Sequence, residues 1–186
     1  MNKLEISISK TISYILRHHP EEFNIQLDSE GFVNLQDILM ILNKKYENIK
    51  ITKEFVENIN RISDKKRFEI EENKIRAIYG HSIKKKIEIP EVLDPPNELF
   101  HGTSEKAYLS IKQIGLKKQK RQYVHLSDDI KTAITVGMRR EKRPPIVLII
   151  DVKKARESDI KFYKSGEIYL ADYIPPEFIS IYKNNK

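Results

Sequence analysis

The first part of the chain repeats apolar residues at the spacing of amphipathic helices. One such helix is predicted over residues 7–18. Its apolar stripe consists of Ile8, Ile12, Ile15 and Leu16. Pro20 ends this helix, because the residue before a proline disfavours the α region. At about 100° per residue, Arg17 points away from the stripe and His18 lies on its flank, so both side chains can face something other than the core.

Two further helices and a β-hairpin are predicted in the same half of the chain. One helix is capped by Asn34, and the other spans residues 52–62. Two strand-like runs follow at residues 67–71 and 74–79, joined by a short turn. Helices followed by a hairpin are typical of a winged helix, so residues 1–86 are predicted to form a winged-helix-like lobe.

Residues 87–97 contain three prolines and are interpreted as a linker. The rest of the chain alternates strands with helices. Strands are predicted over residues 99–101, 123–126, 146–152, 167–170 and 178–182, and helices over 104–114 and from a Ser127 cap onward, with Asp128 and Asp129 in its first turn. The fold class is therefore α+β with two lobes, the second spanning residues 98–186.

Composition narrows the class of protein. The sequence has no cysteine, no apolar run near the roughly 20 residues that span a bilayer, and no signal-peptide pattern at its start. These features predict a cytoplasmic protein without a membrane partner. The net charge is +7, and the excess lies in the second half, since residues 1–94 hold 16 basic and 16 acidic side chains whereas residues 95–186 hold 18 and 11. Basic clusters suit a phosphate-bearing partner, although a solvated surface explains them equally well.

Candidate chemistry lies in a few short segments, each with an ordinary structural alternative. Arg17 beside His18 pairs a permanent cation with a titratable donor, which suits a phosphate, but an exposed helix end explains the pair too. Residues 63–68 form a basic turn that enters a strand. Gly-His-Ser at 80–82 and His-Gly-Thr at 101–103 combine small residues with a histidine, which allows a ligand close to the backbone, or simply makes a turn.

The segment from Arg121 to Ser127 places an arginine before a strand that ends at a predicted helix N-terminus, a ready anion site. His125 could equally be a satisfied core histidine. No metal site is expected, because His81, His101 and His125 lie in separate segments without cysteine or paired carboxylates at ligand spacing. The sequence also lacks a P-loop and a G-x-G-x-x-G motif.

Taken together, these segments resemble the RNA 2′-phosphotransferase family of the KptA type. The resemblance covers nearly the whole chain in order, and its strength lies in the order and spacing rather than in any single motif. The matching segments are Ser9-Lys10 to His18, Leu27-Asp28 with Gly31, residues 63–68, Ile75-Arg76-Ala77, residues 80–82, residues 101–103, Arg121 with residues 123–127, and Val136-Gly137 with Arg139. One departure is Glu167-Ile168-Tyr169, where the family usually has a Gly, Val and Trp run.

The resemblance implies a winged-helix RNA lobe and an ADP-ribosyltransferase-like NAD lobe. It implies that Arg17, His18, Arg67 and Arg121 surround the 2′-phosphate of RNA. It also implies a His, His and aliphatic signature for NAD at His101, His125 and Ile168. The wider set of residues expected at the NAD co-substrate is His81, Ser82, His101, Gly102, Thr103, His125, Ser127, Arg139 and Ile168.

The activity that the resemblance implies is NAD-dependent removal of an internal RNA 2′-phosphate. The protein is expected to be a monomer and to need no metal. Two alternatives remain open. A non-catalytic winged-helix nucleic-acid-binding protein would explain the first lobe and the charge, but would leave the histidine motifs of the second lobe unused. An ADP-ribosyltransferase that caps RNA ends would use the same NAD lobe, but its product would remain ADP-ribosylated.

Overall fold

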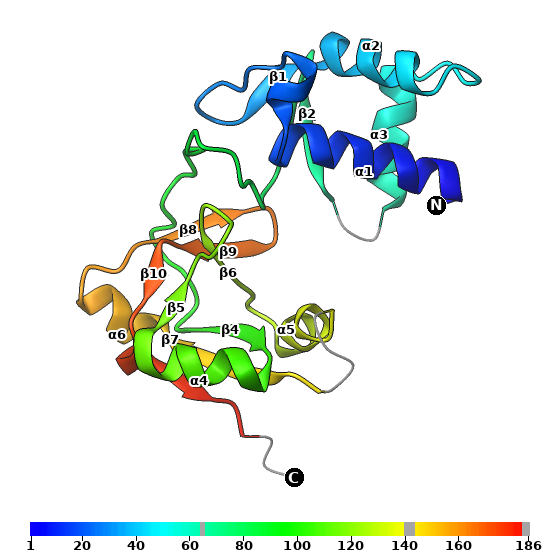
Figure 1. Ribbon diagram of the computed structural model, residues 1–186. Coiled ribbons are helices and arrows are strands. Elements are labelled where there is room, and N and C mark those ends of the chain that lie inside the picture. Colours follow the sequence, from blue (N-terminus) through cyan, green and yellow to red (C-terminus); the bar gives the residue numbers. More distant parts are fainter. Residues whose placement is uncertain (64–65, 140–143, 184–186) are drawn as a thin grey trace. The chain divides into compact units, whose positions relative to one another are not determined.

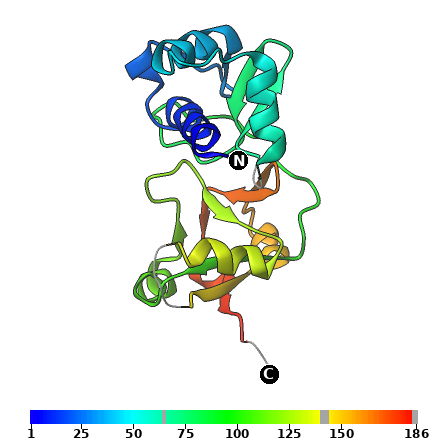
Figure 2. The same ribbon diagram turned by 90° about the vertical axis from the view of Figure 1, so that its right-hand side faces the viewer.

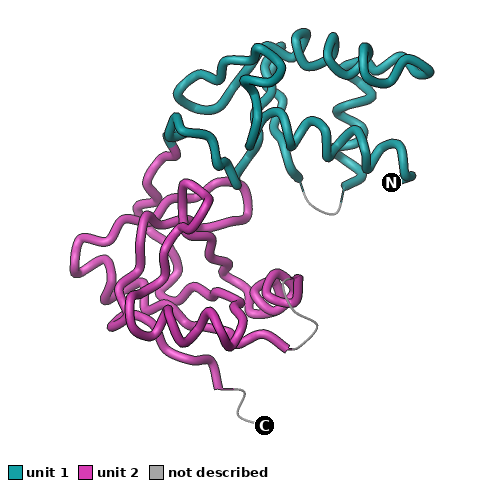
Figure 3. Tube along the Cα trace, viewed as in Figure 1, with its two compact units in different colours: residues 1–88 teal, residues 89–186 magenta. Residues whose placement is uncertain are grey.

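The computed structural model describes residues 1–63, 66–139 and 144–183. The chain forms two compact units, residues 1–88 and residues 89–186 (Figure 3). Both units combine helices with small antiparallel sheets, so the predicted α+β class is confirmed (Figure 1). Within the described ranges, no helix is both long and apolar enough to cross a bilayer.

The first unit contains six main elements and a short 3-10 helix. These are α1 (Lys3–Arg17), η1 (Pro20–Phe23), β1 (Phe32–Asn34), α2 (Leu35–Lys45), α3 (Lys53–Ile62), β2 (Phe68–Glu71) and β3 (Lys74–Ala77). The strands form one antiparallel sheet in the order β1-β3-β2. Strand β1, whose last residue is the cap Asn34, was not expected from the sequence pattern.

Helix α1 begins four residues before the predicted start, because Asn2 forms a capping box with Glu5. The Asn2 side chain accepts the Glu5 N–H at 2.9 Å, and the Glu5 carboxylate accepts the Asn2 N–H at 2.7 Å. The predicted apolar stripe of this helix is fully buried. Two residues separate the helix from Pro20, which opens η1, so α1 ends at Arg17, one residue before the predicted end.

The predicted caps of the next two helices are present. Asn34 Oδ1 accepts the Gln36 N–H at 2.9 Å at the start of α2, and Thr52 Oγ1 accepts the Phe55 N–H at 3.3 Å at the start of α3. Both helices bury one apolar face against α1 and the sheet. The resulting core holds the end of α1 in a fixed position, which matters for the site described below.

The second unit is built around two three-stranded antiparallel sheets, β11-β7-β4 and β6-β9-β8, and a two-stranded pair, β10-β5. Its elements are β4 (Glu98–Thr103), α4 (Glu105–Ile114), β5 (Leu116–Lys117), β6 (Val124–Leu126), α5 (Ile130–Gly137), β7 (Ile146–Asp151), α6 (Val152–Glu157), β8 (Phe162–Ser165), β9 (Ile168–Ala171), β10 (Tyr173–Ile174), η2 (Pro176–Phe178) and β11 (Ile179–Ile181). Phe100 and Ser127 exchange two backbone hydrogen bonds, at 2.7 and 3.0 Å, and so connect β4 to the chain that leaves β6.

The predicted strands of this unit and the helix at 104–114 lie within one or two residues of their observed bounds, whereas β5, α6, β8, β10 and η2 were not predicted, and one predicted cap was wrong. Ser127 does not cap a helix. Asp129 is the cap of α5, where its carboxylate accepts the Thr132 N–H at 2.7 Å. The predicted acidic first turn is therefore absent from α5, since Asp128 precedes the helix and Asp129 is the cap itself.

Gly102 allows helix α5 to lie directly on strand β4 (Figure 2). A Cβ at this glycine would lie 1.9 Å from the Ala133 carbonyl oxygen and 3.1 Å from the Gly137 nitrogen. These are backbone atoms of a helix, and they cannot rotate away as a side chain would. Any larger residue at position 102 must push the helix off the strand.

We expect Gly102→Ala to lower the free energy of unfolding by about 3 kcal/mol or more, the upper end of overpacking costs. Gly166→Ala is the control, because that glycine has a φ of +60° in the turn between β8 and β9. The control should cost only about 1–2 kcal/mol, the penalty of a left-handed conformation. Urea denaturation followed by circular dichroism measures both, and equal losses would show that the approach of α5 does not require glycine.

Candidate functional site

The C-terminal end of α1 is tied to the segment that follows the hairpin. The Ser82 N–H donates a hydrogen bond to the Arg17 carbonyl oxygen at 2.9 Å. The Ser82 hydroxyl oxygen lies 2.8 Å from His18 Nδ1, in a second hydrogen bond. Backbone and side chain of one serine therefore fix both the end of the helix and the ring that follows it.

Arg67 joins the same place from the start of the hairpin. Arg17 Nη2 donates to the Arg67 carbonyl oxygen at 2.9 Å, and the Ile78 N–H donates to the same oxygen at 3.1 Å. Arg67 Nη1 donates to the Ser63 hydroxyl at 2.7 Å. Three segments that are distant in the sequence thus meet within the first unit.

We call Arg17, His18, Arg67, His81 and Ser82 the arginine–histidine cluster. The Arg17 guanidinium also lies over the Tyr79 ring, 5.4 Å from its centroid, which favours the charged group in that orientation. Gly80 adopts a φ of +90°, and a Cβ there would be 3.8 Å from the Arg17 side chain. The turn at Gly80 therefore brings residues 79–82 alongside the arginine.

His81 is the buried member of the cluster, with 3% of its surface exposed. Its Nε2 has no hydrogen-bond partner among the described residues, and it faces Gly31, where a Cβ would be 3.5 Å away. Burial, followed by the positive charge of Arg17 and then of His18 and Arg76, lowers the pKa of His81 from 6.5 to about 4. The ring is neutral at pH 7 and packs beside the cations without adding to their charge.

In the second unit, two backbone carbonyls orient the histidines predicted for NAD. His101 Nδ1 donates to the His125 carbonyl oxygen at 2.9 Å, and His125 Nδ1 donates to the Tyr123 carbonyl oxygen at 3.0 Å. A carbonyl only accepts, so both rings carry a proton on Nδ1. In the neutral ring, Nε2 is then the acceptor.

A pocket of about 640 Å³ lies within this unit. Its walls include four of the predicted ligand-binding residues, namely His101, Thr103, Arg121 and His125. The first turn of α4 closes one side, where the Ser104 hydroxyl accepts the Ala107 N–H at 3.2 Å. The geometry is that of an open pocket with polar strand ends and a helix start along its wall.

The remaining predicted residues of this unit do not line that pocket. Ser127 is buried, and its hydroxyl donates to the Asp129 carbonyl oxygen at 3.0 Å, which gives it a structural role. Gly102 is required by the approach of α5. Arg139 is exposed just beyond α5. Ile168 begins β9 and shares a face with Leu170, which pairs with His125.

The pocket also contains residues that the motif analysis did not single out. These are the lysines Lys106, Lys117, Lys118 and Lys120, together with the apolar residues of α4. The lysine-rich run at 117–120 was visible in the sequence as a basic cluster, but its position on a pocket depends on the β5–β10 pairing. Among the described residues, no group of three or more His, Cys, Asp or Glu side chains could hold a metal ion.

An arginine–histidine cluster in one unit and a cationic pocket in the other are typical of proteins that bind phosphorylated ligands. The chain belongs to the RNA 2′-phosphotransferase, Tpt1 / KptA family, whose model matches residues 3–171.

Three relatives illustrate how much of the chain is shared, and each is named "Probable RNA 2′-phosphotransferase". The protein of Bacillus thuringiensis subsp. konkukian is 46% identical over 99% of this chain and 100% of its own. That of Acetivibrio thermocellus is 43% identical over 92% of this chain and 94% of its own. That of the archaeon Thermococcus kodakarensis is 39% identical over 94% and 95%. The similarity therefore includes both compact units.

The buried, neutral His81 predicts a loss of stability in acid. Its pKa in the folded chain, about 4, lies below the ordinary value of 6.5, so the unfolded chain binds the proton more tightly. Its contribution is fully present above pH 6.5 and is lost as the pH falls toward 4, by at most about 1.4 kcal/mol per pH unit.

Urea midpoints of the wild type and of His81→Gln at pH 7.0, 5.5 and 4.5 measure this effect. The variant should be less sensitive to pH than the wild type. His19→Gln is the control, because the His19 side chain is 44% exposed, and this variant should keep the wild-type dependence. A His81→Gln profile parallel to the wild type would show that another group causes the acid loss.

Proposed function

We propose that this protein removes an internal 2′-phosphate from RNA by transferring it to NAD. The observation that carries the proposal is the arrangement of Arg17, His18 and Arg67, in which Ser82 holds Arg17 and His18, and the Arg67 carbonyl oxygen accepts from Arg17. The names of the relatives support RNA 2′-phosphate as the substrate. NAD as the co-substrate rests on the resemblance and on the polar pocket of the second unit.

In this proposal the first unit is a winged-helix RNA-binding module. Its order of α1, β1, α2, α3, β2 and β3, with a sheet ordered β1-β3-β2, supports this assignment. The guanidinium groups of Arg17 and Arg67 bind the 2′-phosphate, because each presents a planar fork of donors that matches phosphate oxygens. The resemblance adds Arg121 of the second unit as a third arginine that binds the 2′-phosphate.

The second unit is proposed as an ADP-ribosyltransferase-like NAD module. His101 and His125 contribute Nε2 acceptors, since their Nδ1 protons are engaged by backbone carbonyls. Such acceptors suit the ribose hydroxyls of a dinucleotide. Thr103 and the first turn of α4 supply a hydroxyl and backbone N–H groups nearby, of the kind that bind phosphate oxygens.

The proposed chemistry has two steps. A 2′-phosphate oxygen attacks the ribose carbon that bears nicotinamide, the C–N bond breaks, and nicotinamide leaves. The 2″-hydroxyl of the new ADP-ribosyl group then attacks phosphorus, and the RNA 2′-oxygen leaves and takes up a proton. The products are 2′-hydroxyl RNA, nicotinamide and ADP-ribose 1″,2″-cyclic phosphate. Because the first nucleophile is already an anion, the main requirement is positioning and charge stabilisation.

His18 is proposed to hydrogen-bond the phosphate or to protonate the departing 2′-oxygen. Its Nδ1 lies 2.8 Å from the Ser82 hydroxyl, which can donate or accept. When the hydroxyl donates, the neutral ring carries its proton on Nε2 and can offer it to the substrate. When the ring is charged, the same hydroxyl accepts from Nδ1. Ser82 therefore supports His18 before and after a proton transfer.

The first test is whether the 2′-phosphate disappears only when NAD is present. Wild-type protein is incubated with a 2′-phosphorylated oligoribonucleotide, and the products are identified by mass spectrometry. We expect complete dependence on NAD, full activity with a chelator, and a co-product with the mass of ADP-ribose cyclic phosphate. Loss of phosphate without NAD would refute the proposal, and a product that stays ADP-ribosylated would indicate RNA capping instead.

The second test replaces the proposed phosphate ligands one at a time. Arg17→Lys, Arg67→Ala and Arg121→Ala should each lower kcat/KM by about 10²-fold or more, the effect of removing one preorganised donor, ~2.7 kcal/mol. Arg61→Ala is the matched control, because this guanidinium donates to Asn58 at 2.8 Å on the surface of α3, outside the cluster.

These substitutions should slow the second step more than the first, because the second step develops more negative charge at phosphorus. At least one variant should therefore accumulate RNA that carries label from NAD. A wild-type rate in any variant would remove that arginine from the site. If nicotinamide release and dephosphorylation fell by the same factor in every variant, the expectation that the second step is the more sensitive one would be wrong.

A further inference from the structure

Two aromatic rings are stacked at the C-terminal end of α1, beside the arginine–histidine cluster. The ring centroids of Tyr14 and His19 lie 4.8 Å apart, with an angle of 28° between the ring planes. Both rings are accessible, since Tyr14 is 39% exposed and the His19 side chain is 44% exposed. We call Tyr14 and His19 the aromatic pair. It is distinct from the buried apolar stripe of the same helix, which forms the core.

Helical geometry places the aromatic pair on the same side of α1 as Arg17 and His18. Residues that are three or four positions apart are neighbours on a helix, so Tyr14 lies next to both. The Tyr14 carbonyl oxygen accepts the His18 N–H at 3.1 Å and the His19 N–H at 3.2 Å. One carbonyl therefore connects both histidines to Tyr14, and the aromatic pair borders the residues proposed to bind the 2′-phosphate.

Residues of η1 hold both rings in place. The Tyr14 hydroxyl donates to the Glu22 carboxylate, and it lies 3.0 Å from each of the two carboxylate oxygens. His19 Nδ1 lies 3.3 Å from one carboxylate oxygen of Glu21 and 3.3 Å from one of Glu22. Phe23 packs against Tyr14 at 86°, with the ring centroids 6.4 Å apart. Rings held in this way lose little freedom when a ligand binds, so the pair is preorganised for stacking.

The charges around the aromatic pair favour an uncharged planar ligand over a phosphate. Glu21 and Glu22, which hold the rings, are exposed carboxylates that repel phosphate groups. The guanidinium groups of Arg17 and Arg67 belong to the neighbouring cluster, where a phosphate is attracted instead. A nucleobase is planar and uncharged, and unpaired bases of RNA stack on aromatic side chains. The two neighbouring sites therefore match the two parts of one nucleotide.

We propose that the aromatic pair stacks a nucleobase of the RNA while the arginine–histidine cluster binds the 2′-phosphate. The base belongs to the phosphorylated nucleotide or to one of its two neighbours, and the experiment below assigns it. The inference rests on the proposed function, because that function places the 2′-phosphate at the cluster. A base inside a duplex is not available for stacking on a protein ring, so the substrate class is RNA that is single-stranded at the phosphorylated position.

The first experiment removes single bases from the RNA. Single-stranded oligoribonucleotides with one 2′-phosphate carry an abasic residue at the phosphorylated position, on its 5′ side or on its 3′ side. With the full chain and saturating NAD, one of these changes should raise the KM for RNA about tenfold, within the range of one base–aromatic stack. The kcat should stay nearly unchanged, because the stack forms equally in the ground state and the transition state. If no abasic position raised the KM more than about twofold, the inference would be overturned.

Variants then test whether the aromatic pair is the partner of that base. Tyr14→Leu and His19→Ala should each raise the KM for intact RNA about tenfold, and the sensitive abasic position should then cost them less than about threefold more. Tyr14→Phe keeps the ring and should retain most of the sensitivity to the missing base. Met40→Ala is the control, because Met40 is an exposed residue of α2 in the same unit, and it should behave like the wild type. Losses that multiply independently would overturn the inference.

Further measurements separate this inference from a structural role and from the proposed function. The KM for NAD should keep its wild-type value in both variants, and urea denaturation reports their stability. If Tyr14→Leu is unstable, the exposed His19→Ala variant carries the test. Activity that falls only in step with stability would assign the pair to the support of α1 and overturn the inference. Absence of dephosphorylation in the wild type would instead refute the proposed function, and fluorescence anisotropy with the same RNAs would still show whether binding depends on the base and on the pair.

Discussion

The carbonyl oxygen of Arg67 is the point on which the first unit's site depends. It accepts from Arg17 Nη2 at 2.9 Å and from the Ile78 N–H at 3.1 Å, so it connects the end of α1 with both ends of the hairpin. One oxygen with two lone pairs satisfies a guanidinium and an amide at once. Because a half-buried cation needs fixed acceptors, this carbonyl sets the orientation of Arg17, and the arginine in turn sets the position of Tyr79 and Gly80.

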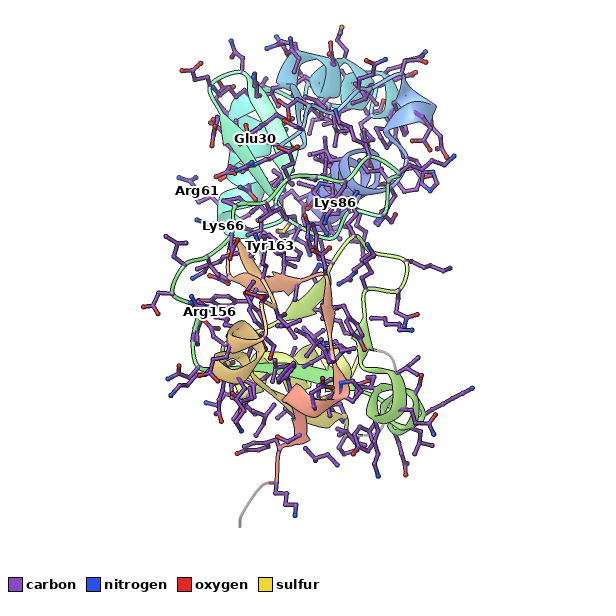
Figure 4. All side chains as sticks on the ribbon, turned by 90° about the vertical axis from the view of Figure 1, so that its left-hand side faces the viewer. Glu30, Arg61, Lys66, Lys86, Arg156 and Tyr163 are labelled. Atoms are coloured by element: carbon purple, nitrogen blue, oxygen red, sulfur yellow. The ribbon has the colours of Figure 1, made fainter. Side chains whose placement is uncertain are left out.

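Backbone constraints play the corresponding role in the second unit. The two hydrogen bonds between Phe100 and Ser127 hold β4 to the chain that leaves β6, and this brings His101 within 2.9 Å of the His125 carbonyl. Gly102 then allows α5 to lie on the strand. Outside the sheets, the guanidinium of Arg156, labelled in Figure 4, donates to the Leu93 carbonyl oxygen at 2.6 Å and anchors the first segment of the unit.

The sequence predicted the long amphipathic elements well, and short or tertiary features poorly. The apolar stripe of α1 and the caps Asn34 and Thr52 follow from local chemistry, and the structure contains all three. Strands β5 and β10 have two residues each, too few to show any period. Ser127 resembled a cap in sequence, but its backbone is used by Phe100, so Asp129 starts α5 instead.

The candidate site, too, could be predicted from the sequence only where local rules apply. Arg17 and His18 could be proposed from a helix end alone, because the helical period places them off the buried stripe. Their association with Arg67 needed the resemblance, since no local rule joins residues that are 50 positions apart. Their association with Ser82 was not predicted, because the resemblance placed Ser82 among the NAD residues. The lysines of the second unit were visible as a charge run, but a solvated surface and a ligand pocket have the same composition. Only the path of the chain after β5 shows that these lysines line a pocket rather than an open surface.

Charged side chains are distributed unevenly along the hairpin formed by β2 and β3. At its turn, Glu71 and Glu72 are exposed, and Glu69 pairs with Arg76 at 2.7 Å, while Arg76 also reaches the Glu30 carbonyl at 3.4 Å (Figure 4). At its open end lie Lys66 and Arg67, followed after the second strand by Lys84, Lys85 and Lys86. The turn also carries Lys74, so the charge changes from mixed at the turn to basic at the open end, where α1 ends with Arg17 and His18. In the proposed function, this uneven distribution of charge favours a phosphate-bearing chain at the open end of the hairpin, next to the arginine–histidine cluster.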